Sequence, residues 1–520
     1  MFKKKETKRT TFIHYSMKGY GVLGFVTNHG YLDNPTFRGM RQALMRDFDE
    51  IYLLDLHGSS KKKEKAPDGN PDKNVFDIQQ GVAIGIFVKS GQNSEQPARV
   101  FHAELWGERK GKYQWLLEND LTTTAWKELK PQAPFYLFVP QDGNLKKEYE
   151  AGWKVTEMMP VNVLGFQTHR DNFAISFDKE VIQHRLLEML DPEISDLDLA
   201  RKYGLRDNRD WKLNEARNLL REDKEWKNKI IRCLYRPFDQ RYCYFSEVAM
   251  DYPRRELKIH VAEKNNLCFN FVRQTKMKSW QHVLASNSLA PAVCIEVKDG
   301  SSIFPLYLYS EQQTSLFAAT SSHSSEPKRQ PNLSPRFIQD LETHLQLQFV
   351  QEGTGDLQTT VGPEDIFHYM YAVFHSPTYR QRYAEFLKID FPRLPLTSDN
   401  NLFRELAAVG QQLVNIHLLE ADVQKDSNYP VAGDNKVEKI EYKDEKVYID
   451  KTQYFEKVKP DVWEFYIGGY QVCQKWLKDR KGRILSYDDC EHYRYILAAI
   501  ERTLALMEEI DEIIPGFPLS

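Results

Sequence analysis

Basic and aromatic residues are interleaved through residues 230–309, a composition suited to contact with nucleic acid. Arginine can bind phosphates or read guanine through two parallel hydrogen bonds, and glutamine can read adenine in the same way. Short aromatic runs alternate with turns here, so we expect strands that carry the polar residues on their edges and loops. The residues that we predict to contact DNA are Arg236, Arg241, Arg254, Arg255, Arg273, Gln274 and Lys276.

The motif Arg-Pro-Phe-Asp-Gln-Arg at residues 236–241 has a structural alternative. Arg236 and Asp239 could pair with each other and brace the fold, and a clasp and a recognition element fit the motif equally well. For the other five predicted residues, DNA contact is favoured. The net charge of the whole chain is −3, but phosphate binding depends on whether basic residues gather on one face.

Other reactive groups give weaker signals. His14 and His29 near Asp33 could be considered as a metal site, but no clustered acidic-plus-lysine pattern accompanies them, so nuclease chemistry is poorly supported. A lone histidine in a loop is usually polar surface. The six cysteines include no Cys-x-x-Cys pair, which argues against a zinc site or a disulfide framework. We therefore expect no metal ligand and no catalytic residue in this chain.

Two short motifs imitate functional sites. Residues 19–24 match Gly-x-Gly-x-x-Gly, but these glycines open and occupy a predicted strand, whereas a nucleotide cradle follows a strand and starts a helix. Asn34-Pro35-Thr36-Phe37 is similar to a loop that holds a flipped adenine. Its place before an amphipathic helix favours a helix start, with Asn34 as the N-cap and Pro35 as the first helical residue.

The clearest predicted scaffold is residues 19–56. Residues 22–27 form a short apolar run that predicts a fully buried strand, and residues 51–56 form a second one. Between them, one helical face carries Phe37, Met40, Leu44, Met45 and Phe48, with Arg38, Arg41 and Arg46 outside it. This order predicts a βαβ unit, in whose sheet ligands bind beyond the carboxyl ends of the strands, here near residues 28–34.

These residues also carry a family resemblance. Three runs resemble the later part of the methyltransferase domain in large adenine-specific DNA methyltransferases, namely GVLGFVTNHGYLDNPTFRGMRQALM, IYLLDLHG and NVFDIQQGVAIGIFVK. The resemblance is to the single-chain type ISP restriction–modification enzymes and phage-exclusion methyltransferases of bacteria. The resemblance continues through YRPFDQRYCYF, FPLYLY, EDIFHYMYAVFHSPTYRQRYAEFLKIDFPRLPL and WEFYIGGYQVCQKWLKDRKGR, and so covers most of the chain.

The resemblance implies the distal part of a DNA adenine-N6 methyltransferase from a restriction–modification or phage-defence system, contributing recognition of double-stranded DNA. In the intact family, S-adenosylmethionine methylates an adenine that is flipped from the duplex. The Gly-rich cofactor turn and the Asn-Pro-Pro-Tyr catalytic loop of that family are absent from this sequence. We therefore expect the chain to begin partway through the sheet, to bind no cofactor alone and to be inactive alone. The missing upstream segment would be either supplied by a neighbouring chain, as in a split enzyme, or lost through truncation. The alternative is a non-catalytic DNA-binding specificity subunit or interaction module.

The 520 residues are enough for about three domains. The composition, with 41% hydrophobic and 12% aromatic residues, is that of a folded protein. No apolar run approaches the roughly 20 residues of a membrane span, and the basic N-terminus lacks the apolar segment of a signal peptide. We expect a cytoplasmic protein without a membrane partner.

The predicted fold class is α/β followed by α+β. Residues 1–180 are expected to form the C-terminal half of a methyltransferase-like domain with a partial doubly wound sheet, including strands at 81–88, 99–106 and 135–139. Residues 181–312 would be a mixed target-recognition region, 313–335 a linker, and 336–520 a mostly helical specificity region. The pattern from residue 195 fits a helix-turn-helix or, as favoured, an ordinary helical hairpin. The run Lys61–Lys65 fits a phosphate contact or a solvated hairpin tip equally well.

Overall fold

The computed structural model describes residues 20–61, 64–90, 96–277, 279–296, 298–310 and 329–519. The chain forms two compact units, Met1–Lys146 and Lys147–Ser520. The predicted boundary near residue 180 falls inside the second unit. None of the described helices combines the length and apolar character needed to cross a lipid bilayer.

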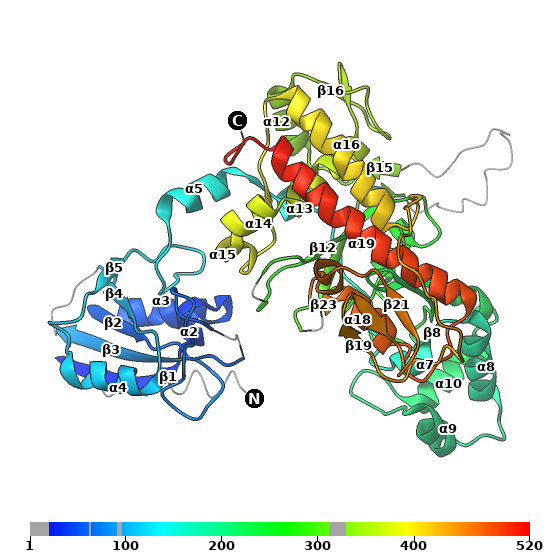
Figure 1. Cartoon of the computed structure of the whole chain (residues 1–520), viewed down its shortest axis with the longest axis horizontal. Helices are drawn as coiled ribbons and strands as arrows, with labels where there is room; N and C mark the ends of the chain where they lie inside the picture. The colour runs from blue at the N-terminus through cyan, green and yellow to red at the C-terminus, as the bar shows by residue number, and fades with distance from the viewer. Residues whose placement is uncertain are drawn as a thin grey trace. The chain divides into compact units, whose positions relative to one another are not determined.

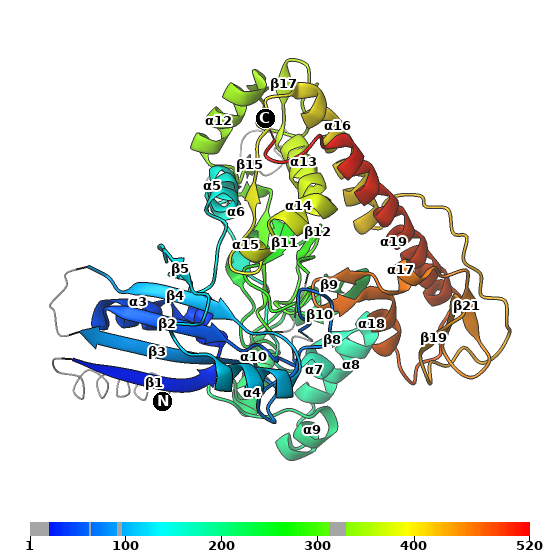
Figure 2. The same ribbon diagram turned by 60° about the vertical axis from the view of Figure 1, so that its left-hand side comes forward.

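The first unit is a mixed sheet with strand order β1-β3-β2-β4-β5 and helices on both faces (Figures 1 and 2). Of the neighbouring strands, only β2 and β4 are parallel. The elements are β1 (Tyr20–Asn28), α2 (Gly30–Asp33), η1 (Pro35–Phe37), α3 (Arg38–Asp47), β2 (Glu50–Asp55), β3 (Val82–Ser90), β4 (Arg99–Glu104), α4 (Arg109–Glu118) and β5 (Lys127–Leu129), followed by α5 (Gly143–Ala151) across the boundary. The strands predicted at 81–88 and 99–106 are therefore confirmed.

The sheet corrects two predictions. β1 and β2 run in the same direction, but β3 lies between them and is antiparallel to both, so the βαβ unit is split. β1 is not a fully buried strand, because β3 is its one neighbour among the described strands and alternate side chains are exposed, with Val22 at 67% and Val26 at 48%. A mixed sheet with one parallel pair does not confirm the predicted doubly wound sheet.

The loop between β1 and α3 follows the capping interpretation. The Asn34 side chain accepts a hydrogen bond from the Thr36 amide at 2.9 Å, and Pro35 is the first residue of η1, which leads directly into α3. Gly21 and Gly24 lie inside β1 rather than at a helix start, and Gly19 lies outside the described residues. These features confirm a helix start at Asn34.

Arg41 is fully buried, although the helical pattern placed it outside the apolar face of α3. Its guanidinium donates to the main-chain carbonyls of Tyr31, Asn34 and Phe135 at 2.7–3.0 Å, and burial lowers its pKa to about 10. The strand predicted at residues 135–139 is wrong, because that segment forms turns and loop. Prolines flank it, and proline cannot donate to a strand ladder.

The second unit combines several small sheets with a helical core. Its strands are β6 (Trp153–Lys154), β7 (Val163–Leu164), β8 (Ile175–Ser176), β9 (Ile230–Arg236), β10 (Asp239–Tyr244), β11 (Cys268–Val272), β12 (Val283–Ser286), β13 (Ser301–Pro305), β14 (Tyr307–Tyr309), β15 (Arg329–Pro331), β16 (Gln348–Phe349), β17 (Thr360–Val361), β18 (Arg393–Leu394), β19 (Glu441–Lys443), β20 (Lys446–Tyr448), β21 (Tyr454–Glu456), β22 (Tyr466–Ile467) and β23 (Tyr470–Gln471). The sheets with three or four strands have the orders β12-β11-β13-β7, β8-β10-β9 and β19-β20-β21. β15 lies within the predicted linker, whose residues 313–328 are outside the described residues.

The helices of this unit are α6 (Val155–Met158), α7 (Asp171–Ala174), α8 (Lys179–Leu190), α9 (Asp196–Tyr203), α10 (Leu213–Glu222), η2 (Trp226–Lys229), α11 (Arg255–Val261), α12 (Pro335–Leu345), α13 (Pro363–His375), α14 (Pro377–Arg382), α15 (Ala384–Leu387), α16 (Asn400–His417), α17 (Pro460–Trp463), α18 (Val472–Lys478) and α19 (Tyr487–Ile513). Residues 204–212 connect α9 to α10, which is longer than the roughly three- or four-residue turn of a helix-turn-helix. The ordinary hairpin interpretation therefore fits better.

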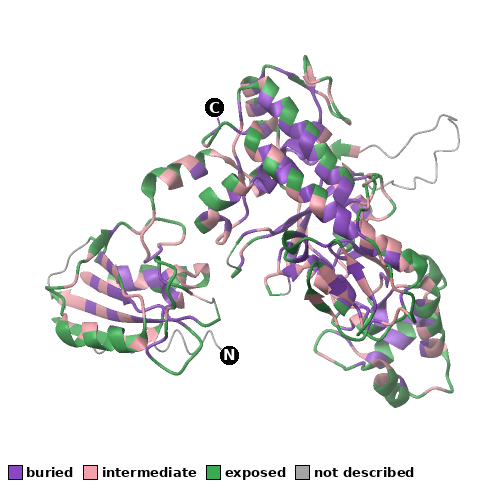
Figure 3. Cartoon of the chain, viewed as in Figure 1, coloured by how far each residue is buried: buried purple, intermediate pink, exposed green. Residues whose placement is uncertain are grey.

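α13 is the centre of this helical core. Almost all of its side chains are buried (Figure 3), and it packs against α16 and α19. Gly410 on α16 permits the close approach, because a Cβ there would lie 1.9 Å from the carbonyl oxygen of His368 on α13. The ring of Phe367 on α13 stacks on that of Phe269 on β11, with the ring centres 3.9 Å apart, so this helical core supports the strand that leads into Arg273, Gln274 and Lys276.

Candidate nucleic-acid interface

Arg236 and Arg241 lie on the hairpin of β9 and β10, in a buried network around Asp239. Asp239 is 1% exposed and accepts hydrogen bonds from Arg241 at 2.6 Å and from Arg480 at 3.1 Å. Burial works to raise the pKa of Asp239, but the two guanidinium groups lower it overall. Arg236 donates instead to the carbonyl oxygen of Tyr235. The proposed Arg236–Asp239 pair is therefore corrected: Arg241 and Arg480 form the clasp.

This clasp leaves little of either arginine on the surface. Arg236 is 8% exposed, and the side chain of Arg241 is 11% exposed. The guanidinium groups of Arg241 and Arg480 also lie over the ring of Phe177, at 4.1 and 4.6 Å from its centre. Arg241 therefore braces the hairpin and Arg236 is buried beside it, and a DNA contact by either Arg236 or Arg241 stays a prediction.

Arg254 and Arg255 lie at the start of α11, where the backbone is unusual. Arg254 has φ +58°, a left-handed backbone conformation that residues other than glycine rarely adopt. Its Nε is buried without a hydrogen-bond partner among the described residues. The side chain of Arg255 is 73% exposed and forms an ion pair with Glu247 at 2.8 Å. Strained residues with unsatisfied polar atoms gather at binding sites, so this turn is a candidate contact point.

A polar group beside this turn was missed by sequence reasoning. We call His169, Arg170, Asn208 and Asp251 the Asp251 cluster. The Asp251 carboxylate contacts His169 Nδ1 at 2.5 Å and accepts from Arg170 at 2.6 Å and Asn208 at 2.9 Å. Burial works to raise the pKa of Asp251, but these partners lower it overall. No local motif marks the cluster, because its members are 43 to 82 residues apart from Asp251 in sequence.

Residues 273–277, the recognition segment, follow β11. Thr275 is 6% exposed, and its amide donates to the carbonyl oxygen of Lys388 at 3.1 Å, which fixes the middle of the segment. On either side, Arg273 and Lys276 are exposed and Gln274 is half-buried. Arg273 pairs with Asp390 at 3.0 Å. The recognition segment thus presents three of the seven predicted residues on an anchored backbone.

The first unit gathers polar groups at one edge of its sheet. β1, β2 and β4 run in the same direction, so His29, Asp55 and Glu104 lie at or just after their carboxyl ends. His29 Nδ1 contacts Asp55 at 3.0 Å, and His57 lies 3.7 Å from Asp55 and 3.6 Å from Glu104. We call these four residues the sheet-end cluster. His29 is 6% exposed, so its interpretation as polar surface is wrong; His14 lies outside the described residues.

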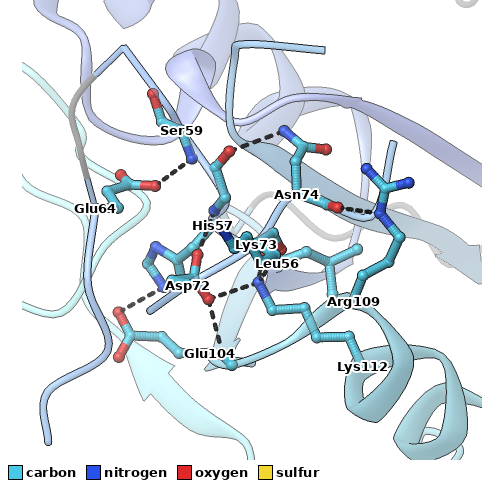
Figure 4. Close-up of polar contacts among 12 residues, drawn as sticks. Leu56, His57, Ser59, Glu64, Asp72, Lys73, Asn74, Glu104, Arg109 and Lys112 are labelled. Carbon is cyan, nitrogen blue, oxygen red and sulfur yellow. Dashed lines mark hydrogen bonds and ion pairs between the residues drawn. The ribbon is translucent and has the colours of Figure 1, made fainter. Parts of the chain in front are cut away.

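The long loop after β2 is fastened to α4 by a buried ion pair (Figure 4). Lys112 Nζ donates to Asp72 at 2.7 Å and to the carbonyl oxygens of Leu56 and Lys73, and both charged side chains are fully buried. The Asp72 carboxylate also accepts hydrogen bonds from the backbone amides of Gly58 and Gly107. The loop borders an open groove of about 720 Å³. Residues 62–63 of the predicted charge run lie outside the described residues, so its role stays open.

Three solved structures are similar to this chain in fold. The first is described as the ATP-dependent Type ISP restriction-modification enzyme LlaBIII bound to DNA, with a TM-score of 0.71, 19% identity, and coverage of 98% of this chain and 34% of that one. The second is a DrdV–DNA complex, with a TM-score of 0.69, 20% identity, and coverage of 98% of this chain and 52% of that one. The third is a nuclease-deletion mutant of the Type ISP restriction-modification enzyme LlaGI in complex with a DNA substrate mimic, with a TM-score of 0.66, 19% identity, and coverage of 98% of this chain and 40% of that one. The chain therefore spans between about a third and a half of these proteins.

A family model covers the second unit almost completely. No curated protein sequence matches the chain. Residues 157–509 match the model described as the Type ISP C-terminal specificity domain, and this range contains every residue that we predicted to contact DNA. Because the match spans more than half of the sequence, the chain belongs to the type ISP C-terminal specificity domain family, as its resemblance indicated.

Proposed function

We propose that this chain recognises a target sequence in double-stranded DNA on behalf of a restriction–modification enzyme. The observation that carries the proposal is the family match over residues 157–509. The three similar structures, each solved with DNA or a DNA mimic, support it. The net charge of −3 requires that any contact be made by local groups rather than by the field of the whole chain.

The recognition segment is the best-formed candidate for reading bases. Arginine can bind guanine through two hydrogen bonds and glutamine can bind adenine, and Arg273 and Gln274 offer these groups side by side. An anchored backbone reduces the ordering cost of binding, and the Thr275 amide supplies that anchor. Base contacts from Arg273 and Gln274 would therefore be comparatively well defined.

Arg273 can leave its ion pair without exposing an uncompensated charge. Asp390 accepts Arg273 at one oxygen and Lys154 Nζ at the other, the latter at 2.6 Å. When Arg273 turns to a phosphate or a guanine, Lys154 still balances the carboxylate. Exchange of one exposed ion pair for a DNA contact costs little, since such pairs contribute only about 0–1 kcal/mol.

The second candidate contact is the start of α11 together with the Asp251 cluster. The side chains of Arg255, Arg209 and His169 are 73%, 86% and 55% exposed. The ion pairs of Arg255 with Glu247 and of Arg209 with Asp210 are open to solvent, so a phosphate could replace them at low cost, whereas His169 pairs with the buried Asp251. These groups would position the duplex, whereas the recognition segment would read sequence.

The finer proposal is that the enzyme served by this chain methylates adenine N6. It rests on the resemblance of residues 22–88 to the later part of adenine-specific methyltransferase domains. Among the described residues, no glycine-rich turn joins a strand end to a helix start, which supports the proposal that this chain alone does not hold S-adenosylmethionine. The methyl donor and the catalytic loop would come from another segment or chain. The alternative, a specificity subunit without a catalytic partner, predicts the same DNA binding.

The test is DNA binding by the full chain across a series of salt concentrations, with duplexes drawn from a random-sequence pool. We expect the Arg254→Ala, Arg255→Ala, Arg273→Ala triple variant to bind more weakly and to lose about one unit of salt slope for each phosphate contact removed. Arg404→Ala, an exposed arginine on α16, is the matched control. Unchanged affinity and salt slope in the triple variant would remove these residues from the interface.

Sequence reading and cofactor use need separate measurements. Selection from the pool should yield an enriched sequence for the wild type, and Arg273→Ala with Gln274→Ala should relax it at one or two positions, by about 1–3 kcal/mol per base.

Calorimetry with S-adenosylmethionine should show no binding to the chain alone. Tight stoichiometric binding would contradict the claim that the donor pocket lies elsewhere.

A further inference from the structure

The sheet-end cluster has the donor atoms and the spacing of a transition-metal site. His29, Asp55 and His57 each offer one ligand atom, and these atoms lie within 4.8 Å of one another. Two ligands of a tetrahedral zinc ion, each about 2.1 Å from the metal, lie about 3.4 Å apart. The contacts of Asp55 with His29 at 3.0 Å and with His57 at 3.7 Å lie on either side of that value.

The fold holds these groups firmly. His57 has φ +50°, and its ring stacks on Trp106 with the ring centres 3.3 Å apart. Its amide donates to the Asp55 carboxylate at 2.9 Å. A Cβ at position 81 would lie 2.4 Å from the His29 ring, so Gly81 is required for the ring to pack against β3. The three donors therefore converge because of the surrounding packing, with a strained backbone at His57.

The partners of Asp55 also point to a cation. Asp55 is 6% exposed, and its ion pairs in the described part of the chain are with His29 and His57. Among the described residues, no lysine or arginine forms an ion pair with Asp55 or with the half-exposed Glu104. A buried carboxylate needs a positive partner, and a divalent ion would supply two positive charges at once.

Glu104 has the position of an outer carboxylate. It lies 3.6 Å from His57 Nε2, the ring nitrogen opposite the one that faces Asp55. His57 Nε2 is buried without a hydrogen-bond partner among the described residues. Histidine ligands commonly donate their second N–H to a carboxylate, which fixes the ring and strengthens metal binding. A small movement of the half-exposed Glu104 side chain would complete that contact.

We propose that the sheet-end cluster binds one divalent transition-metal ion, Zn²⁺ first among them, through His29, Asp55 and His57, with Glu104 orienting His57. Two imidazoles and one carboxylate suit zinc better than Mg²⁺ or Ca²⁺, which prefer oxygen ligands. The ion would join the carboxyl ends of β1 and β2 and fix the start of the loop that Lys112 holds from the other side. This site goes beyond DNA recognition and does not depend on it.

The experiment uses the purified full chain, stripped with a chelator and titrated with Co²⁺, whose visible absorption reports nitrogen and oxygen ligands. We expect one saturable equivalent that Zn²⁺ displaces. Replacing a ligand, as in His29→Gln, Asp55→Asn or His57→Gln, should weaken binding by more than the roughly 10- to 100-fold that Glu104→Gln causes. His169→Gln disrupts a comparable histidine–aspartate pair in the Asp251 cluster and should leave Co²⁺ binding unchanged.

A second readout guards against misfolded variants. Zn²⁺ should raise the melting temperature of the wild type and of Glu104→Gln, and it should not raise that of His57→Gln. Absence of a saturable Co²⁺ spectrum in the wild type would overturn the proposal without any variant. A spectrum that survives in both His29→Gln and His57→Gln would do the same, because it would place the ion elsewhere.

Discussion

Each unit buries a pair of neighbouring histidines, but the two pairs have partners of different charge. In the first unit the rings of His29 and His57 lie 6.2 Å apart, and both contact the carboxylate of Asp55. In the second unit the rings of His375 and His417 lie 5.5 Å apart, inside the helical core. The same residue type thus occupies an ionic site at a sheet edge and a neutral one between helices.

The neutral pair shows what burial alone does to histidine. His417 contacts the hydroxyl groups of Tyr371 and Thr503, and His375 contacts the Tyr371 carbonyl oxygen. Burial, with the nearby positive charge of Arg380, lowers the pKa of His417 to about 3 and that of His375 well below its usual value. These two imidazoles are core side chains whose ring nitrogens form hydrogen bonds with neutral groups. Only the pair beside carboxylates has the charge balance of a cation site.

The largest expected effect comes from breaking the charged interior of the first unit. Lys112→Met leaves the Asp72 carboxylate buried without its cation, and removing one partner of a buried ion pair costs about 3–5 kcal/mol. We expect the free energy of unfolding to fall by that amount in urea denaturation of the full chain. The loop that begins at His57 would lose its attachment to α4 as well.

The double variant Lys112→Met with Asp72→Asn separates charge from shape. Asparagine keeps an oxygen for the amides of Gly58 and Gly107 but carries no charge, so most of the lost stability should return. Lys276→Met, at an exposed position, should change stability by less than about 0.5 kcal/mol. If the single Lys112→Met variant unfolds like the wild type, the interior of this unit does not depend on paired charges.

Acid should act on the neutral interior of the second unit. The pKa of His417 is about 3 in the folded chain, below its ordinary value of 6.5, so the unfolded chain takes up a proton first as the pH falls. Stability is therefore lost as the pH falls through 6.5 toward 3, and His417 accounts for about 2 kcal/mol between pH 7 and pH 5. Urea denaturation at these two pH values measures the loss.

The His417→Gln variant should reduce that pH dependence by the same amount. Asp55 adds nothing in this range, because its pKa lies below 3.8 and both states are ionised. An unchanged pH dependence in His417→Gln would mean that the folded and unfolded chains protonate this imidazole equally between pH 7 and pH 5, and the contrast between the two pairs would fail.

Sequence patterns predicted the features that depend on near neighbours. β3, β4 and the helix start at Asn34 follow from apolar periodicity and from capping chemistry, which act within a few residues. The family resemblance rests on long runs and was confirmed over residues 157–509. The split βαβ unit and the exposed β1 were missed, because periodicity does not say which strands become neighbours.

The buried polar groups were missed because their partners are distant in sequence. Arg41 has the spacing of a solvent-facing residue on α3, but its side chain is buried and donates to the carbonyl oxygen of Phe135, 94 residues away. The sheet-end cluster unites His29 with Asp55, 26 residues apart, and only the common direction of β1 and β2 brings them together. For Arg236 and Arg241, the composition suggested DNA, whereas Asp239 and Arg480 decide their burial.

The smallest effect tests whether the second pair is truly neutral. Thr503 Oγ1 lies 3.0 Å from His417 Nε2 and donates to the carbonyl oxygen of Ala499 at 2.7 Å. Thr503→Val keeps the shape and removes the hydroxyl group, and loss of a neutral hydrogen bond costs about 1 kcal/mol, measured by urea denaturation. A double-mutant cycle with His417→Gln isolates the contact from the rest of the core. Bonds to charged groups contribute more, about 1.5–3 kcal/mol. A coupling energy in that higher range would therefore assign a charge to His417 and make the helical core resemble the sheet edge.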